Sequence, residues 1–216
     1  ESDRRKIRER MARIRKELDQ LRRQRSFTRA RRSRQGIPLA ALVGYTNAGK
    51  STLLNTLTRS EVLAENKLFA TLDPTTRRLR FPAEKEIIMA DTVGFIRNLP
   101  KELMDAFRAT LEELEAADLL LHVADASHPD LLQQMSAVES ILAEMELDRM
   151  PRLMILNKWD QLEAPARAEL ADAFPHALTI SAKNGEGCKA LLEELELLLL
   201  RHPASMIATD APTVLN

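Results

Sequence analysis

Cysteine is nearly absent from this chain, which has Cys188 and no other in 216 residues. A lone thiol excludes an internal disulfide framework and a metal site made of paired cysteines, and it is typical of proteins of the reducing cytosol. The four histidines show no pair at metal-ligand spacing, so we expect no histidine-bound metal. These absences favour a cytoplasmic protein in which Cys188 is a residue of the hydrophobic core.

Long apolar runs and aromatic residues are scarce as well. No stretch reaches the roughly 18 uncharged apolar residues of a membrane-spanning helix, so we expect no stable membrane insertion. Aromatic residues make up 4% of the chain, while 44% hydrophobic and 30% charged residues are typical of a soluble, helix-rich protein with a packed core. No signal peptide is visible, and the first residues, Glu1-Ser2-Asp3, lack a methionine, so we expect a fragment of a longer protein.

The chain as a whole has no excess of either charge sign, because 32 Lys and Arg balance 32 Asp and Glu. This average conceals an asymmetry. Residues 1–34 contain 15 basic and 5 acidic side chains, and the remainder contains 17 basic and 27 acidic ones. Such a division is typical of a nucleic-acid-binding arm joined to an acidic globular body.

The basic arm has the spacing of a coiled-coil helix over residues 1–25. Its apolar residues recur at intervals of four and three, namely Ile7, Met11, Ile14, Leu18 and Leu21. This predicts one apolar seam that needs a partner helix. The intervening arginines have two open roles, as a solvated face or as contacts to RNA phosphates, and the small number of acidic partners favours RNA. Residues 26–37 have the composition of a basic linker.

From residue 38 to 202 the pattern alternates between strands and helices, and we expect the globular domain here. Strands are predicted at 39–43, 78–81, 86–90, 118–125, 152–157 and 177–181, with a turn at 82–85. Helices are predicted near 101–116, 130–147, 163–173 and 186–200. This order predicts an α/β fold with a mostly parallel sheet flanked by helices. Residues 203–216 lack periodicity and are expected to form a tail.

The first predicted strand leads into a phosphate-binding pattern, G-x-x-x-x-G-K-[ST]. Its residues are Gly44, Tyr45, Thr46, Asn47, Ala48, Gly49, Lys50 and Ser51, followed by Thr52 at the start of a helix. Backbone N–H groups and the positive end of the helix dipole then point at a phosphate. Lys50 reaches the β- and γ-phosphates, and Ser51 ligates Mg²⁺. The alternative is a strand–helix turn with a chance lysine, and the motifs below argue against it.

A second motif, Asp91-Thr92-Val93-Gly94, follows a later predicted strand. Ligands bind at such strand ends in open α/β sheets. Asp91 can hold Mg²⁺, and the Gly94 N–H can contact a γ-phosphate. The pattern D-x-x-G alone is weak, because any strand followed by an aspartate turn produces it. Its place downstream of the phosphate loop strengthens the prediction.

The last two motifs are typical of a guanine site. In Asn157-Lys158-Trp159-Asp160 the Asp160 carboxylate can accept both the N1–H and the 2-amino group of guanine, a donor pair that adenine lacks. The stem of Lys158 can lie along the base. Ser181-Ala182-Lys183 follows the next strand, and the Ala182 N–H can donate to guanine O6. We therefore expect GTP or GDP as the ligand.

Together these motifs resemble the translation-factor type of P-loop GTPases and, more closely, the HflX family of ribosome-associated GTPases. The likeness includes residues 44–51, 68–77, 91–96 and 157–160 and the basic helix around residues 3–5. On this resemblance we expect the given sequence to be a fragment without the family's N-terminal domain. The resemblance implies a monomeric enzyme that hydrolyses GTP to GDP. It also implies binding to the large ribosomal subunit and its rRNA, not to DNA, and the splitting of stalled or idle ribosomes.

The resemblance also assigns the first switch, with a catalytic, Mg²⁺-ligating threonine at Thr71. Thr75 and Thr76 are chemically equal candidates from the sequence alone. The nucleotide-contacting stretch around it is Phe69, Ala70, Thr71, Leu72 and Asp73. Lys50, Asn47 and Gly94 are the other residues expected to act in catalysis.

Phe95 stands where Ras-like GTPases have the glutamine that orients the attacking water, so we expect slow intrinsic hydrolysis. Two sources could stabilise the transition state of hydrolysis in place of this glutamine, and the sequence leaves both open. Asn47 stands where potassium-activated GTPases have a K⁺-coordinating asparagine, and a K⁺ there would act as an arginine finger does. The same side chain is equally suited to stabilising the loop by hydrogen bonds. The second source is the ribosome, which could place a group in trans.

Three functions agree with these residues. They are a ribosome-dissociating GTPase, a ribosome-assembly or RNA-remodelling GTPase, and a non-catalytic RNA-binding module that GTP stabilises. Turnover stimulated by ribosomal subunits would exclude the third. Sucrose-gradient profiles with GTP would separate the first two.

Overall fold

The computed structural model describes residues 36–59, 76–91 and 114–201. The described residues from Pro38 onward belong to one structural unit. The predicted helix at 1–25, nearly all of the linker at 26–37 and the tail at 203–216 lie outside the described residues, as does most of the helix expected at 101–116. The division of the chain into these segments therefore stays a prediction.

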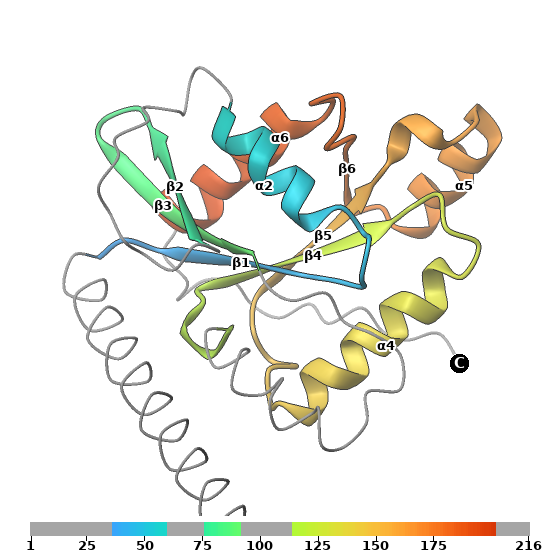
Figure 1. Cartoon of the computed structure of the whole chain (residues 1–216), viewed down its shortest axis with the longest axis horizontal. Coiled ribbons are helices and arrows are strands. Elements are labelled where there is room, and N and C mark those ends of the chain that lie inside the picture. Colours follow the sequence, from blue (N-terminus) through green and yellow to red (C-terminus); the bar gives the residue numbers. More distant parts are fainter. Residues whose placement is uncertain (1–35, 60–75, 92–113, 202–216) are drawn as a thin grey trace, which may run out of the picture. The chain divides into compact units, whose positions relative to one another are not determined.

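A six-stranded sheet forms the centre of this unit, with the strand order β2-β3-β1-β4-β5-β6 (Figure 1). The strands are β1 (Leu39–Val43), β2 (Thr76–Phe81), β3 (Lys85–Asp91), β4 (Leu119–Asp125), β5 (Arg152–Asn157) and β6 (Leu178–Thr179). Neighbouring strands are parallel except β2, which pairs antiparallel with β3. The α/β fold with a mostly parallel sheet is confirmed, and the predicted strands match to within a few residues.

Helices cover both faces of the sheet. They are α2 (Lys50–Arg59), α4 (Leu131–Glu144), α5 (Ala164–Ala173) and α6 (Cys188–Glu196), with short helical turns η1 (Leu114–Ala116), η2 (Trp159–Gln161) and η3 (Leu197–Arg201). Figure 1 shows α2 and α6 on one face and α4 on the opposite face. Within the described ranges, no helix combines the length and the apolar character that crossing a bilayer would require.

Strand residues alternate between these two faces, because successive side chains of a strand point to opposite sides. One face of the sheet packs with α2 and α6 through buried side chains that include Leu42, Met89, Leu121, Val123, Leu53, Leu57, Leu191 and Leu195. Cys188 lies in the same cluster, as the sequence predicts, and burial raises the pKa of its thiol. On the other face, Ala124 and Leu156 pack with Leu131 of α4. The core thus fixes the sheet from both sides.

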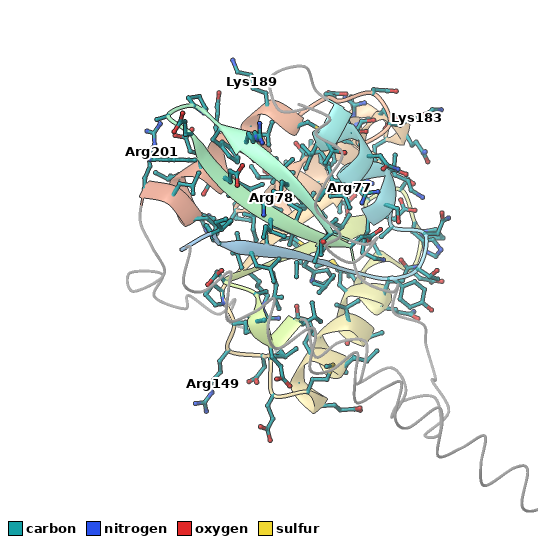
Figure 2. All side chains as sticks on the ribbon, turned by 60° about the vertical axis from the view of Figure 1, so that its left-hand side comes forward. Arg77, Arg78, Arg149, Lys183, Lys189 and Arg201 are labelled. Carbon is teal, nitrogen blue, oxygen red and sulfur yellow. The ribbon has the colours of Figure 1, made fainter. Side chains whose placement is uncertain are left out.

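The edge strand β2 is rich in arginine. Arg78 Nη1 lies 2.9 Å from Glu86 Oε2 of β3, and Arg80 Nε lies 3.2 Å from Glu86 Oε1. Figure 2 shows Arg77 and Arg78 on this strand, and both residues are exposed. Charged side chains on an edge strand oppose the pairing of its open backbone groups with another chain.

A polar cluster connects β4, α4 and β5. His122 of β4 is 1% exposed, and its Nδ1 lies 3.4 Å from Glu139 Oε1 of α4. Arg152 of β5 donates to the other oxygen of Glu139 and to the carbonyl of Asp148. The His122 imidazole and the Arg152 guanidinium lower the pKa of Glu139 to about 2, although burial opposes the shift. Glu139 is therefore ionised in the folded protein at neutral pH.

The substitution Glu139→Gln is expected to destabilise the fold in a pH-dependent way. Because the folded pKa lies below the ordinary value of 4.5, the ionised carboxylate stabilises the fold above about 4.5, and this contribution is lost as the pH falls toward about 2. The side chain is 43% exposed, so we discount the effect for solvent screening to roughly 1 kcal/mol. Urea unfolding at pH 7 and pH 3 measures it.

Glu144→Gln is the matched control, because Glu144 is an exposed residue of the same helix. It should change the free energy of unfolding little at either pH. A loss of stability in Glu139→Gln that is equally large at both pH values would contradict the assignment.

Candidate functional site

The predicted site motifs that the structure describes lie at one edge of the sheet, where the parallel strands end. The loop after β1 carries the phosphate pattern, β3 ends at Asp91, β5 ends at Asn157, and β6 leads into Ser181. Strand β1 pairs with β3 on one side and with β4 on the other. The chain order reverses there, and this is the place where open α/β sheets bind ligands.

The two glycines of the phosphate loop are required by their surroundings. Gly44 has φ +150°, and a Cβ at this residue would lie 2.1 Å from the Val123 carbonyl oxygen. Gly49 has φ +97°, and a Cβ there would lie 2.2 Å from Asn157 Nδ2. No other residue type fits either position without moving its neighbours. The loop is therefore packed closely against the ends of β4 and β5.

Lys50 begins helix α2 and lies under this loop. The residue is 6% exposed, and its Nζ donates hydrogen bonds to the carbonyl oxygens of Gly44 at 2.9 Å and Tyr45 at 3.0 Å. Burial lowers the pKa of Lys50, and the nearby Asp91 carboxylate opposes that shift. The carbonyl oxygens of the loop thus hold this buried ammonium within the phosphate pattern.

Ser51 and Asp91 approach each other from α2 and β3. Ser51 Oγ donates to Asp91 Oδ2 at 2.5 Å. The other carboxylate oxygen, Asp91 Oδ1, is buried and has no hydrogen-bond partner among the described residues. A buried carboxylate oxygen without a partner is costly, and an oxygen pair of this kind suits a hard divalent cation. The residues present therefore fit Mg²⁺.

Asn157 joins two loops through its side chain. It is 2% exposed, its Nδ2 donates to the Ala48 carbonyl oxygen at 2.8 Å, and its Oδ1 accepts from the Ala182 N–H at 2.9 Å. Thr56 of α2 also donates to the Ala182 carbonyl oxygen, at 2.6 Å. The phosphate loop and the loop after β6 are thus held in one arrangement by a buried amide.

Lys158 and Asp160 follow Asn157 at the turn η2. Lys158 has a left-handed backbone, with φ 63° and ψ 31°, and Asp160 is half-buried in the turn. The Trp159 N–H donates to the Ile180 carbonyl oxygen at 3.0 Å, which ties the turn to the segment after β6. Lys158 Nζ lies 2.6 Å from Asp125 Oδ2. Its placement along a guanine base stays a prediction.

Asp125 is a residue whose role the sequence does not reveal. It is the last residue of β4 and is 6% exposed. Burial alone would raise its pKa, but hydrogen bonds from Lys158 and Ser127 outweigh burial and lower it. Ser127 and Gln161 are also missed by sequence reasoning. The one available signal is that Asp125 ends a strand at the edge where the motifs gather.

The loop after β6 contains the last predicted motif. Ser181 is fully buried and Ala182 is 1% exposed. Ser181 Oγ accepts from the Asn184 N–H at 3.2 Å, and the Ser181 N–H donates to the Glu186 carbonyl oxygen at 2.9 Å. Lys183 is exposed, and Figure 2 shows it at the surface. The serine therefore shapes the loop.

Asn47 has a left-handed backbone in the phosphate loop, with φ 61°. Its side chain is exposed and makes no hydrogen bond to another residue of the described part. Asparagine is one of the few residues with a side chain that adopt this conformation readily. The left-handed backbone is therefore one structural reason for an asparagine at position 47. Thr46 beside it is exposed, Tyr45 is half-buried and Ala48 is buried.

Several predicted site residues lie outside the described residues. They are Phe69, Ala70, Thr71, Leu72 and Asp73 of the first switch, and Thr92, Val93 and Gly94 after β3. The exposed Thr52 lies one residue after Ser51 in α2. The roles of all these residues stay predictions.

Comparison with known proteins gives consistent matches. The family described as 50S ribosome-binding GTPase matches residues 39–158. GTPase HflX of Caldanaerobacter subterraneus subsp. tengcongensis is 47% identical over 93% of this chain and 46% of its own length. GTPase HflX of Magnetococcus marinus is 50% identical over 90% of this chain and 45% of its own length. The chain spans about half the length of the curated relatives it matches.

A solved structure is similar at the level of the fold. It is a GTP-binding protein from the hyperthermophilic archaeon Sulfolobus solfataricus in complex with GDP. The two chains are 28% identical and have a TM-score of 0.59, over 83% of this chain and 58% of the other.

Proposed function

The chain belongs to the 50S ribosome-binding GTPase family and, within it, to the HflX group, and from this premise we propose that it binds and hydrolyses GTP as a switch on the large ribosomal subunit. The observation that carries the proposal is the buried Asn157 side chain. It bonds to Ala48 of the phosphate loop and to Ala182 of the loop predicted to contact guanine O6. One nucleotide can therefore be held at its phosphates and at its base.

Base recognition is assigned to Asp160 and Ala182. The Asp160 carboxylate accepts from the N1–H and 2-amino groups of guanine, and the Ala182 N–H, which donates to Asn157 Oδ1 in the structure, turns to O6 when guanine binds. Adenine lacks this donor pair and would leave the Asp160 carboxylate without these partners, and buried polar groups without partners are strongly unfavourable. The guanine preference follows from this mismatch.

Hydrolysis is assigned to the phosphate loop and α2. Lys50 is already held between the loop carbonyls, so little reorganisation is needed when charge develops on the phosphates. Ser51 and Asp91, with Thr71, would hold Mg²⁺, which neutralises negative charge on the phosphate oxygens when bound. Phe95 cannot orient water. Asn47 with K⁺, or a group from the ribosome, supplies the remaining stabilisation.

The ribosome is the proposed partner for two reasons. The matching family is described as ribosome-binding, and residues 1–34 contain 15 basic side chains against 5 acidic ones, which suits contact with rRNA phosphates. We place the protein in the cytoplasm as a monomer that separates ribosomal subunits. The same site chemistry would serve an assembly factor, and sucrose-gradient profiles with GTP distinguish the two outcomes.

GTP hydrolysis by this chain in KCl and in NaCl, each with and without large ribosomal subunits, tests the proposal. We expect slow turnover alone and a stimulation of at least about tenfold by subunits, because the missing stabilisation is then supplied. A further increase in K⁺ over Na⁺ would assign the cation role to Asn47. Lys50→Met is the control and should lower the stimulated rate roughly 100-fold or more.

An absence of turnover in all four conditions, with GTP binding intact, would contradict hydrolysis by this chain and favour a non-catalytic RNA-binding module. Failure to bind GTP in preference to ATP would overturn the nucleotide assignment itself.

A further inference from the structure

A cluster of four polar side chains lies beside the guanine motif, and the functions assigned above leave three of them without a role. The cluster consists of Asp125, Ser127, Lys158 and Gln161. Asp125 is the last residue of β4 and stands in register with Asn157 of β5. The parallel pairing of β4 and β5 therefore brings the carboxylate next to the first residue of the motif.

Both carboxylate oxygens of Asp125 have partners. Oδ2 accepts from Lys158 Nζ at 2.6 Å, and Oδ1 accepts from the Ser127 N–H at 3.1 Å and from Ser127 Oγ at 2.6 Å. Asp125 and Lys158 have side chains that are 9% and 22% exposed. An ion pair this short and this poorly solvated holds both groups in place.

Lys158 needs such support because its backbone is unusual. A residue with a side chain rarely adopts φ 63° unless its surroundings impose the conformation. This left-handed residue turns the chain from β5 into η2, which carries Asp160. The direction of Asp160 therefore depends on the turn at Lys158.

The end of the same turn touches the cluster as well. Gln161 Oε1 lies 3.1 Å from Ser127 Oγ, and the Ala126 N–H donates to the Asn157 carbonyl oxygen at 2.9 Å. The segment after β4 thus contacts the chain both before and after Asp160. Polar contacts at both ends of a short turn restrict the orientation of the residue between them.

We propose that Asp125, assisted by Ser127, is a positioning residue for guanine recognition, which fixes the ammonium of Lys158 and so aligns the Asp160 carboxylate with the base. Asp125 touches neither the base nor the phosphates in this role. The inference rests on the proposed guanine binding. The hydrogen bonds from Lys158 and Ser127 that lower the pKa of Asp125 are the same contacts.

The test compares the dissociation constants of GDP and inosine diphosphate for the whole chain and for Asp125→Asn. Inosine diphosphate lacks the 2-amino group, so Asp160 makes one hydrogen bond fewer to it. We expect Asp125→Asn to weaken GDP binding about tenfold and to reduce the preference for GDP over inosine diphosphate roughly fivefold. A purely structural defect would weaken both ligands alike and leave the preference unchanged.

Two further variants complete the design. Asp172→Asn is the matched control, because Asp172 is an exposed aspartate of α5, and it should leave both constants unchanged. On a Lys158→Met background, Asp125→Asn should have no further effect, because the carboxylate acts through the ammonium. If Asp125→Asn lowered the GDP preference further on the Lys158→Met background, the proposal that Asp125 acts through Lys158 would be overturned.

The outcomes separate a failure of the proposed guanine site from a failure of the positioning role of Asp125. If the unchanged chain does not prefer GDP over inosine diphosphate, the proposed guanine site fails. If it does and Asp125→Asn keeps the preference, only the positioning role fails. Should Asp125→Asn not fold, Ser127→Ala takes its place, with a smaller expected loss of preference, and an unaltered preference in Ser127→Ala overturns the inference.

Discussion

Asp160→Asn is expected to change the nucleotide preference of the chain from GTP to xanthosine triphosphate. Xanthine has a carbonyl where guanine has its 2-amino group, so an amide that accepts from N1–H and donates to this carbonyl replaces the carboxylate that accepts twice. With GTP, one charge-assisted hydrogen bond is lost, and the amide N–H of the new asparagine faces the 2-amino group of guanine, which is also a donor. These two effects should weaken GTP binding roughly 100-fold or more. Competition of each triphosphate against a fluorescent nucleotide measures the change.

The position of Asp160 makes this an informative substitution. The residue lies half-buried in η2, and the turn is tied to neighbouring segments by the Trp159 N–H and by the Asn157 carbonyl oxygen. An asparagine of the same shape can therefore occupy the same place. Binding of ATP should stay weak in both proteins. Equal losses for GTP and xanthosine triphosphate would contradict the assignment of Asp160 to the base.

The sequence predicts the strands of this fold well, because their signals are local. The run Leu39–Val43 is entirely apolar and entirely buried. The motifs at the strand ends could be placed at one edge of the sheet before the structure, since parallel strands present their carboxyl ends together. The pairing of Ser51 with Asp91 follows the same logic, although its short distance could not be predicted.

Contacts between distant segments could not be predicted in the same way. Nothing in the local pattern says that Gly49 must be small because Asn157 Nδ2 would lie 2.2 Å from its Cβ. The partner of Lys158 is likewise 33 positions away, in another strand. Such facts depend on the register between strands, which the pattern of a single chain does not specify. The role of Thr71 still rests on the family resemblance, and that of Gly94 rests on the D-x-x-G pattern.

Asn157→Ala is expected to cost both stability and nucleotide binding. It removes the partners of the Ala48 carbonyl oxygen and of the Ala182 N–H, and both residues are 1% exposed. Leaving a buried donor and a buried acceptor without partners costs about 1–3 kcal/mol each, so the free energy of unfolding should fall by roughly 2–6 kcal/mol. Chemical denaturation measures this loss, and nucleotide titration shows the accompanying fall in affinity.

Asn184→Ala is the matched control, because Asn184 is exposed in the same loop and its hydrogen bond to Ser181 uses the backbone N–H. It should be nearly neutral. A stability of Asn157→Ala close to that of Asn184→Ala would contradict a structural role for the amide.

The Asn157 amide, which bridges Ala48 and Ala182, also predicts that the effects of substitutions at Asn157 and Gly49 on stability are coupled. In the unchanged chain, Gly49→Ala forces a methyl group against Asn157 Nδ2 and also imposes φ +97° on alanine. In the Asn157→Ala background the first of these penalties disappears and the second persists. Gly49→Ala should therefore be less destabilising there than in the unchanged chain. Additive losses would show that the loop and the amide do not share this contact, and the bridge would then not be what holds the phosphate and guanine loops together.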